Sequence, residues 1–162
     1  LMNQEHLTIS DRAVVREAEK RAEETGHPAV AMELSDGRII TGKTSDLLGP
    51  SAAVLLNALK ELAGIPHEKH IISPTAIEPI QTLKTKYLGS KNPRLHTDEV
   101  LIALSTTAAE NKDAAKALSM LAALKGCQVH SSVMLSSVDK KMFQKLDCEV
   151  TCDPVYETVN KK

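Results

Sequence analysis

The stretch DGRIITGKTSDLLGPSAAVLLNALKELAG, residues 36–64, predicts the centre of the fold. Its Asp-Gly pair lies between two apolar segments with a period of two residues. This pattern is typical of a β-hairpin, because both residues tolerate the positive φ of a tight turn. A loop rich in Gly, Ser and Thr follows. Residues 50–63 then carry apolar side chains at helical spacing, between Pro50 in the first turn and Gly64 at the end. We expect the other elements to pack around this hairpin, loop and helix.

The rest of the chain alternates between helical and extended patterns. Ser10 is a suitable N-cap for a helix that ends at Gly26, whereas residues 1–9 carry no pattern and are expected to be a disordered or linker segment. Pro79 is expected to exclude a helix that runs through it, so only a turn is predicted just before it. Further helices are predicted at about 78–88, after Thr97 as N-cap, at 114–124 and at 138–146. Strands are predicted at 70–72, 127–135 and 149–152. Residues 155–162 are expected to fray.

Helices separated by β segments indicate one α/β domain over residues 10–154. We expect three layers, α/β/α, around a small mixed sheet that is antiparallel at its hairpin. A chain of 162 residues can bury about two thirds of its unfolded surface in one core. The chain begins with Leu rather than Met, which suggests a segment of a longer protein.

The composition argues against several classes of function. The net charge is −1, so no global field favours nucleic acid or an anionic membrane. One Phe, two Tyr and no Trp leave few platforms on which bases could stack. No apolar run approaches the roughly 18 residues of a membrane span, and no signal-peptide pattern opens the chain. We therefore expect neither a nucleic-acid nor a membrane partner.

The three cysteines, Cys127, Cys148 and Cys152, show no metal-ligand spacing. Cys148 and Cys152 lie four residues apart in a predicted strand, which places their Cα atoms about 13 Å apart. A disulfide needs a Cα separation below about 7 Å. We interpret the cysteines as buried, reduced thiols in a reducing cytoplasm.

A basic, polar stretch without any acidic residue lies between Glu78 and Asp98, and it is the first candidate for ligand binding. It ends at a helix N-terminus, where free N–H groups and the helix dipole favour an anion. Its arginine offers a planar fork for phosphate or carboxylate, and its histidine can titrate nearby. The alternative is a solvated loop whose arginine pairs with Asp98 or with a neighbouring domain. The acidic first turn, which already complements the helix dipole, favours this alternative. The residues are Lys84, Lys86, Ser90, Lys91, Asn92, Arg94 and His96.

The tripeptide Gly-Lys-Thr at 42–44 invites comparison with a phosphate-binding loop. The full G-x-x-x-x-G-K-[ST] pattern is missing, because the preceding glycine, Gly37, belongs to the hairpin turn. A looser role stays open, in which Lys43 and Ser51 line a pocket together with the loop that carries Arg94.

His130, beside Ser131 and Ser132, permits two interpretations. Acid–base chemistry would need an adjacent nucleophile, and no sequence signature supplies one. A structural histidine held by hydrogen bonds is therefore favoured. The remaining histidines show no ligand spacing with each other, so no metal site is predicted and no cofactor is identified.

Three stretches resemble a bacterial protein family. They are DGRIITGKTSDLLGPSAAVLLNALKELAGI, EPIQTLKTKYLGSKNPRLHTDEVLIALS and KGCQVHSSVMLSSVD. They are similar to the C-terminal part of the domain of unknown function numbered 1846, also called uncharacterised protein family 0371, and the similarity extends from Ser10 to Pro154. The resemblance implies that this chain is the last third of a multidomain cytoplasmic protein. It transfers no catalytic residues.

The order of elements also resembles the cytidine-deaminase-like α/β/α fold. In a zinc deaminase the helix after the hairpin begins with a His or Cys ligand followed by a proton-transferring Glu, and a later helix begins Pro-Cys-x-x-Cys. Here that first helix begins Pro50-Ser51-Ala52-Ala53, and the sequence contains no Cys-x-x-Cys. The resemblance therefore implies the fold without the zinc and without that chemistry.

Two functions follow from this sequence. The first is a non-catalytic C-terminal domain that packs against the N-terminal domains of its parent protein and helps it assemble, with a homo-oligomer as one form of assembly. The alternative is the phosphate- or nucleotide-binding part of an enzyme active site that the missing domains complete.

Overall fold

The computed structural model describes residues 12–155, so the predictions for residues 1–9, for Ser10 and for the tail beyond 155 lie outside this range. The elements are α1 (Ala13–Thr25), β1 (Ala29–Glu33), β2 (Ile39–Lys43), α2 (Pro50–Ala63), α3 (Pro74–Thr82), a π-helical segment η3 (Leu83–Tyr87), α4 (Thr97–Ala108), α5 (Lys112–Leu118), a 3-10 segment η4 (Leu121–Leu124), β3 (Gln128–Ser131), α6 (Ser137–Lys145) and β4 (Glu149–Cys152).

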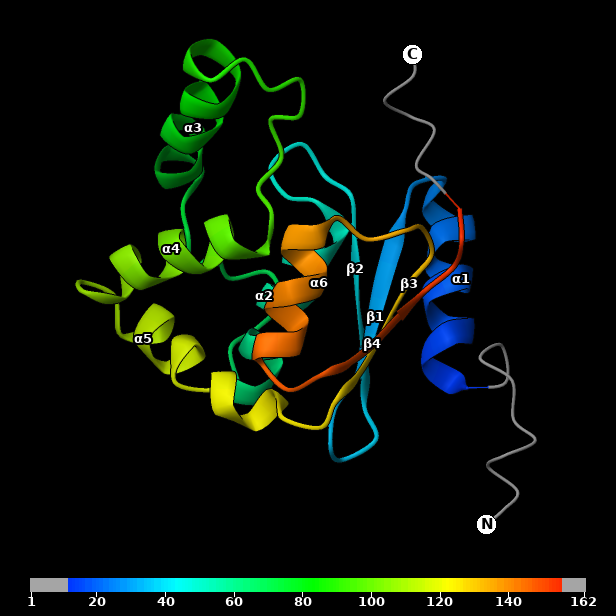
Figure 1. Ribbon diagram of the computed structural model, residues 1–162. Coiled ribbons are helices and arrows are strands. Elements are labelled where there is room, and N and C mark those ends of the chain that lie inside the picture. Colours follow the sequence, from blue (N-terminus) through cyan, green and yellow to red (C-terminus); the bar gives the residue numbers. More distant parts are fainter. Residues whose placement is uncertain (1–11, 156–162) are drawn as a thin grey trace.

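A four-stranded sheet in the order β2-β1-β3-β4 forms the middle layer. β1 pairs antiparallel with β2 and with β3, and β3 pairs parallel with β4. Figure 1 shows α1 on one face of this sheet and α2 and α6 on the other. The α/β class, the mixed sheet, the antiparallel hairpin and the helices on both faces are thus confirmed. The resemblance to the deaminase topology and the extent of the domain, residues 10–154, stay predictions.

The inner strand β1 is buried on both faces from Ala29 to Met32, which explains why these four residues are all apolar. Ala29 and Ala31 point towards α1, and the small side chains let this helix lie close to the sheet. Val30 and Met32 point into the main core, which also includes α2 and the fully buried Phe143 of α6. Alternation along a strand therefore assigns each residue to one of two cores.

Two predicted elements are wrong in the region between α2 and α4. Ile71 and Ile72 are buried but belong to an irregular segment instead of a strand, because no neighbouring strand pairs with them. The segment before them is fixed by Lys60, whose Nζ donates to the carbonyl oxygen of His67 at 2.6 Å. Pro79 was expected to break a helix, but it lies inside α3. This helix begins with Ser73 as its N-cap and Pro74 in its first turn, and the one backbone hydrogen bond that Pro79 cannot donate does not end it.

Two further elements are shorter than predicted. The helix expected at 114–124 is divided into α5 and η4. The strand expected at 127–135 stops at Ser131, because the Ser131 hydroxyl donates to the carbonyl oxygen of Val133 at 2.6 Å and accepts from the Val133 amide at 3.2 Å. This local pairing turns the chain out of the sheet.

The cysteines are free, as expected, and Cys127 and Cys148 are buried, whereas Cys152 is only partly buried in β4. Burial raises the pKa of the Cys148 thiol to about 12, so this thiol stays protonated and unreactive at neutral pH. No described helix combines the length and the apolar character needed to cross a membrane.

Strand β2 and helix α2 approach each other most closely at Gly42. A Cβ on this residue would lie 2.2 Å from the backbone nitrogen of Val54 and 2.7 Å from its Cα. These are backbone atoms of a buried helix, and they cannot move aside as the end of a flexible side chain can. Gly42 is therefore required by the contact between the two elements rather than by its own backbone angles.

We predict that Gly42→Ala lowers the free energy of unfolding by about 1–3 kcal/mol or more, the cost of overpacking a core. Urea denaturation followed by circular dichroism measures this change. Gly49→Ala is the matched control, because its Cβ would lie at an ordinary 3.6 Å from the Leu95 carbonyl oxygen. As Gly49 is the N-cap of α2, its replacement should cost less than about 1 kcal/mol. Equal stabilities of Gly42→Ala and the unmodified chain would contradict this account.

Candidate functional site

The two candidate stretches of the sequence lie side by side in the structure. The Leu95 amide donates to the Leu47 carbonyl at 3.0 Å, and the Gly49 amide donates to the Leu95 carbonyl at 3.1 Å. Leu95 itself is fully buried. The loop before α2 and the loop before α4 are thereby held together as one surface.

Helix α4 begins one residue earlier than predicted. His96, not Thr97, is its N-cap, and the His96 amide donates to Oε1 of Glu99 at 2.8 Å. Thr97 is the first helical residue, and its amide and its hydroxyl both donate to Oδ1 of Asp139, at 3.0 and 2.8 Å. Asp139 comes from the first turn of α6. The N-terminus that the sequence offered to an anion is thus occupied by two carboxylates of the chain itself.

Lys84 is the buried cation of the basic stretch. Only 8% of its surface is exposed, and its Nζ donates to Oε1 of Glu99 at 2.9 Å and to the carbonyl oxygen of Arg94. A buried ammonium group needs such partners, because its desolvation is costly when it is unpaired. Lys84 therefore joins η3 to the loop and to α4, and its charge is used inside the fold.

His96 and Asp139 form an ion pair in which Nδ1 and Oδ2 are 3.4 Å apart. The hydrogen bond to Asp139 raises the pKa of His96, against an opposing effect of burial. Burial alone would raise the pKa of Asp139, but the hydrogen bonds from His96 and Thr97 outweigh it and lower that pKa. Each group therefore stabilises the charged form of the other.

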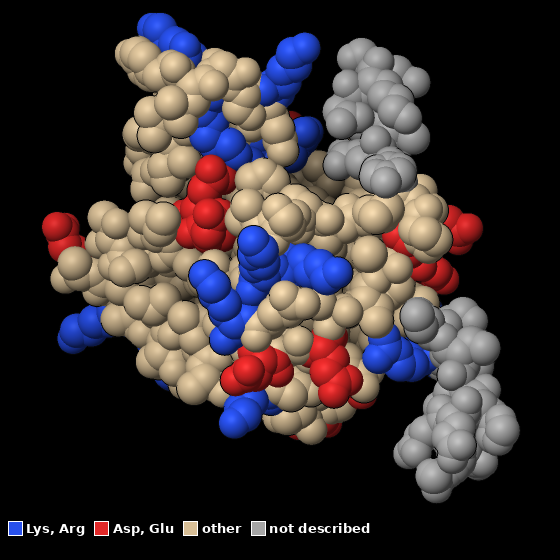
Figure 2. Space-filling model, in the orientation of Figure 1, with Lys and Arg blue, Asp and Glu red and all other residues tan. Residues whose placement is uncertain are grey.

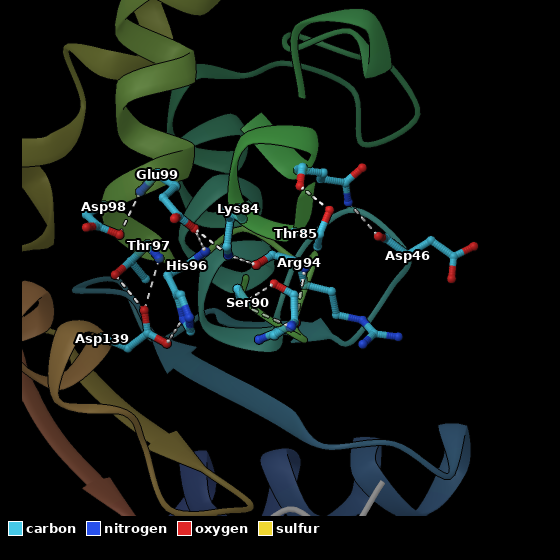
Figure 3. Close-up of polar contacts among 12 residues, drawn as sticks. Asp46, Lys84, Thr85, Ser90, Arg94, His96, Thr97, Asp98, Glu99 and Asp139 are labelled. Carbon is cyan, nitrogen blue, oxygen red and sulfur yellow. Dashed lines mark hydrogen bonds and ion pairs between the residues drawn. The ribbon is translucent and has the colours of Figure 1, made fainter. Parts of the chain in front are cut away.

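The predicted ligand-binding residues do not point towards one common site. Figure 3 shows His96 and Arg94 pointing to opposite sides of their loop. The Nε of Arg94 donates to the carbonyl oxygen of Ser45, so the predicted alternative pairing with Asp98 is not what holds it. Ser90 and Asn92 shape the loop: the Asn92 amide donates to the Ser90 hydroxyl and the Arg94 amide donates to the Asn92 side chain, each at 3.1 Å.

Lys91 is exposed, and Lys43 and Ser51 lie apart from each other. Register places Lys43 on the face of the sheet that α1 covers, because it pairs with Ala29. Ser51 is buried in α2, which covers the opposite face. A surface pocket beside η4 and α6 is lined by none of the nine candidate residues. Figure 2 shows Lys and Arg side chains gathered near the centre of one face, with Asp and Glu side chains above and below them.

Glu99 and Asp139 are the groups that the sequence analysis missed. Glu99 is three residues after the N-cap, a spacing that predicts a capping box once the cap is placed at His96. Asp139 is likewise three residues after Ser136, whose hydroxyl accepts from the Asp139 amide at 3.2 Å. The Ser136 cap was readable from the sequence, whereas the capping box at Glu99 became apparent only with His96 as the N-cap. The contact of Asp139 with Thr97, 42 positions away, was not readable from the sequence.

His130 is fully buried and hydrogen-bonded at both ring nitrogens, to Thr151 at 2.7 Å and to Asp153 at 3.0 Å. The interpretation as a hydrogen-bonded histidine is therefore confirmed. Burial lowers the pKa of this histidine, against the opposing effect of Asp153, so the neutral ring is favoured.

We predict that Asp139→Asn lowers the pKa of His96 and reduces the free energy of unfolding by about 1–3 kcal/mol at about pH 5. The His96 contribution is complete below its ordinary pKa of 6.5 and is lost as pH rises through its raised value. The Asp139 contribution is present above its ordinary pKa of 3.8 and is lost as pH falls through its lowered value. The stability difference should thus be largest between these two ordinary values and shrink at higher pH.

An NMR titration of the His96 ring and urea denaturation at several pH values measure both effects. Asp98→Asn is the control, because Asp98 lies in the same helical turn but accepts from the Glu99 amide and does not contact His96. A stability difference that is independent of pH would exclude the ion pair as its cause.

Comparisons with known proteins agree with the resemblance found in the sequence. The family described as "Domain of unknown function DUF1846, C-terminal" matches residues 10–161. A "UPF0371 protein" of Corynebacterium aurimucosum is 60% identical over 150 residues, which cover 93% of this chain and 30% of that protein. A "UPF0371 protein" of Streptococcus sanguinis is 53% identical over 157 residues, which cover 97% of this chain and 32% of that protein. This chain spans about a third of the length of these relatives, and it belongs to the family of the DUF1846 C-terminal domain.

Proposed function

We propose that this chain is the C-terminal part of a longer cytoplasmic protein, in which it docks against the remaining chain and supports assembly without carrying out catalysis itself. The length of its relatives and the C-terminal family description support a parent with further domains. Free thiols support the cytoplasm as its compartment.

The observation that carries this proposal is an apolar arm, formed by α3, η3 and Leu88. Figure 1 shows α3 projecting from the top of the molecule, away from the sheet. Ile77 is the buried side chain of α3. Three large apolar side chains of the arm are strongly exposed: Leu83 at 49%, Tyr87 at 69% and Leu88 at 70%. A group of exposed apolar side chains on a projecting element is typical of a surface that a partner covers.

The polar side chains at the base of the arm also support a docking function. Lys84, His96, Glu99 and Asp139 satisfy one another inside the fold, and they link η3, α4 and α6. Groups that are fully engaged in this way stabilise the arm at its base. The base of the arm is therefore fixed, while its apolar surface is presented outward.

We predict that Leu83, Tyr87 and Leu88 are labelled more slowly by hydroxyl radicals in the full parent protein than in this 162-residue chain. Burial of these side chains against the parent would exclude the reagent. Val138, which is 41% exposed on α6, provides the control and should be labelled equally in both proteins. Equal labelling of the arm in both proteins would reject the proposed docking surface. Protection that appears in the isolated chain as its concentration rises would instead identify a second copy as the occupant.

Stability measurements on the full parent protein and on the isolated chain provide a second test. The double substitution Leu83→Ser and Leu88→Ser should reduce the stability of the parent by about 1 kcal/mol or more for each side chain. The same double substitution should leave the isolated chain nearly unchanged, because these side chains already face solvent there.

A second candidate function is anion binding at the joined loops, and the contact of Leu95 with Leu47 and Gly49 favours it. This contact brings the Arg94 loop next to the loop that begins α2. A phosphate-containing ligand would be held by Arg94 and Lys91, with Ser90 and Asn92 as further candidates and with the rest of the parent completing the site. His96 is engaged by Asp139, and Lys43 and Ser51 lie on opposite faces of the sheet, so these three predicted residues are left out of this proposal.

We predict for this candidate that inorganic phosphate raises the melting temperature of the chain and that Arg94→Ala weakens the response at least about tenfold in phosphate concentration. Loss of a hydrogen bond to a charged group, about 1.5–3 kcal/mol, gives this factor. Lys125→Ala, an exposed cation beside the surface pocket at η4, is the control. An identical phosphate response in all three proteins would remove Arg94 from any such site.

A further inference from the structure

A cluster of polar side chains lies on the face of the sheet that α1 covers. Ala31, His130 and Thr151 share this face, because Ala31 pairs with His130 and His130 pairs with Thr151 across three neighbouring strands. Asp153 follows β4 directly, and its amide donates to the Ser131 carbonyl at 2.9 Å. Helix α1 adds Glu19 from above. One ligating atom of Glu19, one of His130 and one of Asp153 all lie within 4.8 Å of one another.

The imidazole of His130 is oriented from both sides. Its Nδ1 is 2.7 Å from the hydroxyl of Thr151, and its Nε2 is 3.0 Å from Oδ1 of Asp153. The Thr151 hydroxyl is fixed in turn, because Arg12 donates to it at 2.8 Å and it lies 3.4 Å from the Val129 carbonyl. The positive charge of Arg12 is thus on the Nδ1 side of the ring. Asp153 is on the Nε2 side, and Glu19 lies close to both His130 and Asp153.

Two carboxyl groups beside one imidazole nitrogen require a positive partner or a shared proton. A divalent ion bound to both carboxylates would supply this positive charge and remove the repulsion between them.

We propose that Glu19, His130 and Asp153 bind a divalent transition-metal ion, with Zn²⁺ as the best fit to one imidazole nitrogen and two carboxylate oxygens. Zn²⁺ accepts both kinds of ligand at about 2.0–2.2 Å, so neighbouring ligand atoms in a tetrahedral site are about 3.4 Å apart. The Nε2–Oδ1 distance of 3.0 Å needs to open by only a few tenths of an ångström. Mg²⁺, which prefers oxygen ligands alone, fits less well.

The surroundings of the three residues suit their roles as ligands. His130 is fully buried and cannot turn away, whereas Asp153 is 24% exposed and Glu19 is exposed, which gives the ion a path from solvent. On binding, the ring proton is carried by Nδ1 and donated to Thr151, which donates its own proton to the Val129 carbonyl, while Nε2 offers its lone pair to the ion. A hydrogen bond of this kind on the second ring nitrogen is the usual way in which a metal-binding histidine is oriented. Any proton that the two carboxyl groups carry passes to solvent when the ion binds, and water fills the remaining coordination position.

Calorimetric titration of the 162-residue chain with Zn²⁺ at neutral pH tests this site. We expect one ion to bind per chain and Glu19→Gln to weaken binding at least about tenfold. Glu23→Gln is the matched control, because Glu23 is exposed one helical turn further along α1 and is not one of the proposed ligands. Glu23 acts on Glu19 through its charge alone, so this substitution should change binding far less than Glu19→Gln does. Asp153→Asn should weaken binding as Glu19→Gln does. Cys152→Ser should leave it intact, which excludes the partly buried thiol as the ligand.

NMR of the His130 ring supplies a readout at the nitrogen itself. Zn²⁺ should shift the Nε2 resonance strongly, and Mg²⁺ at the same concentration should not. Glu19 is exposed, so Glu19→Gln tests the site even if Asp153→Asn fails to fold. Absence of binding, or equal binding in the unmodified chain, Glu19→Gln and Glu23→Gln, would overturn the proposal.

Discussion

The rest of the structure depends on the close packing of β2 against α2 at Gly42. Backbone atoms of Val54 occupy the space that a side chain at Gly42 would fill, so the helix lies directly on the strand. This contact fixes the short loop between them, and the loop holds Leu95 through two backbone hydrogen bonds. Leu95 in turn fixes the start of α4, which meets α6 through Thr97 and Asp139. These contacts connect β2 and α2 to the start of α4 and to α6.

Two cationic side chains of the basic stretch form ion pairs inside the fold. Lys84 is buried against Glu99, and His96 is paired with Asp139. Ionised groups leave water only when partners replace their hydration, so the burial of these side chains explains why each has an opposite charge beside it. The exposed cations of the loop, Lys91 among them, are not bound by this requirement.

Alternation along β3 separates two chemical environments by a single residue. Val129 points into the main core, and His130 points towards α1. The polar groups beneath α1 are therefore isolated from those around α4 by the full thickness of the sheet. This separation is why the apolar arm and the residues of the proposed metal site lie on opposite sides of the sheet.

The sequence by itself determined the hairpin, the bounds of α2 from Pro50 to Ala63 and the α/β class, because turn residues, caps and hydrophobic period act over a few neighbouring positions. It also marked the two loops that the structure joins. It wrongly predicted a strand at Ile71-Ile72. Two adjacent apolar residues indicate that a segment is buried, but they do not show whether another strand pairs with it. Only the tertiary structure decided that Asp139 reaches Thr97 and that Glu19, His130 and Asp153 converge. These residues come from elements far apart in the chain, and side-chain contacts between such elements are set by strand register and helix packing, which no local pattern encodes.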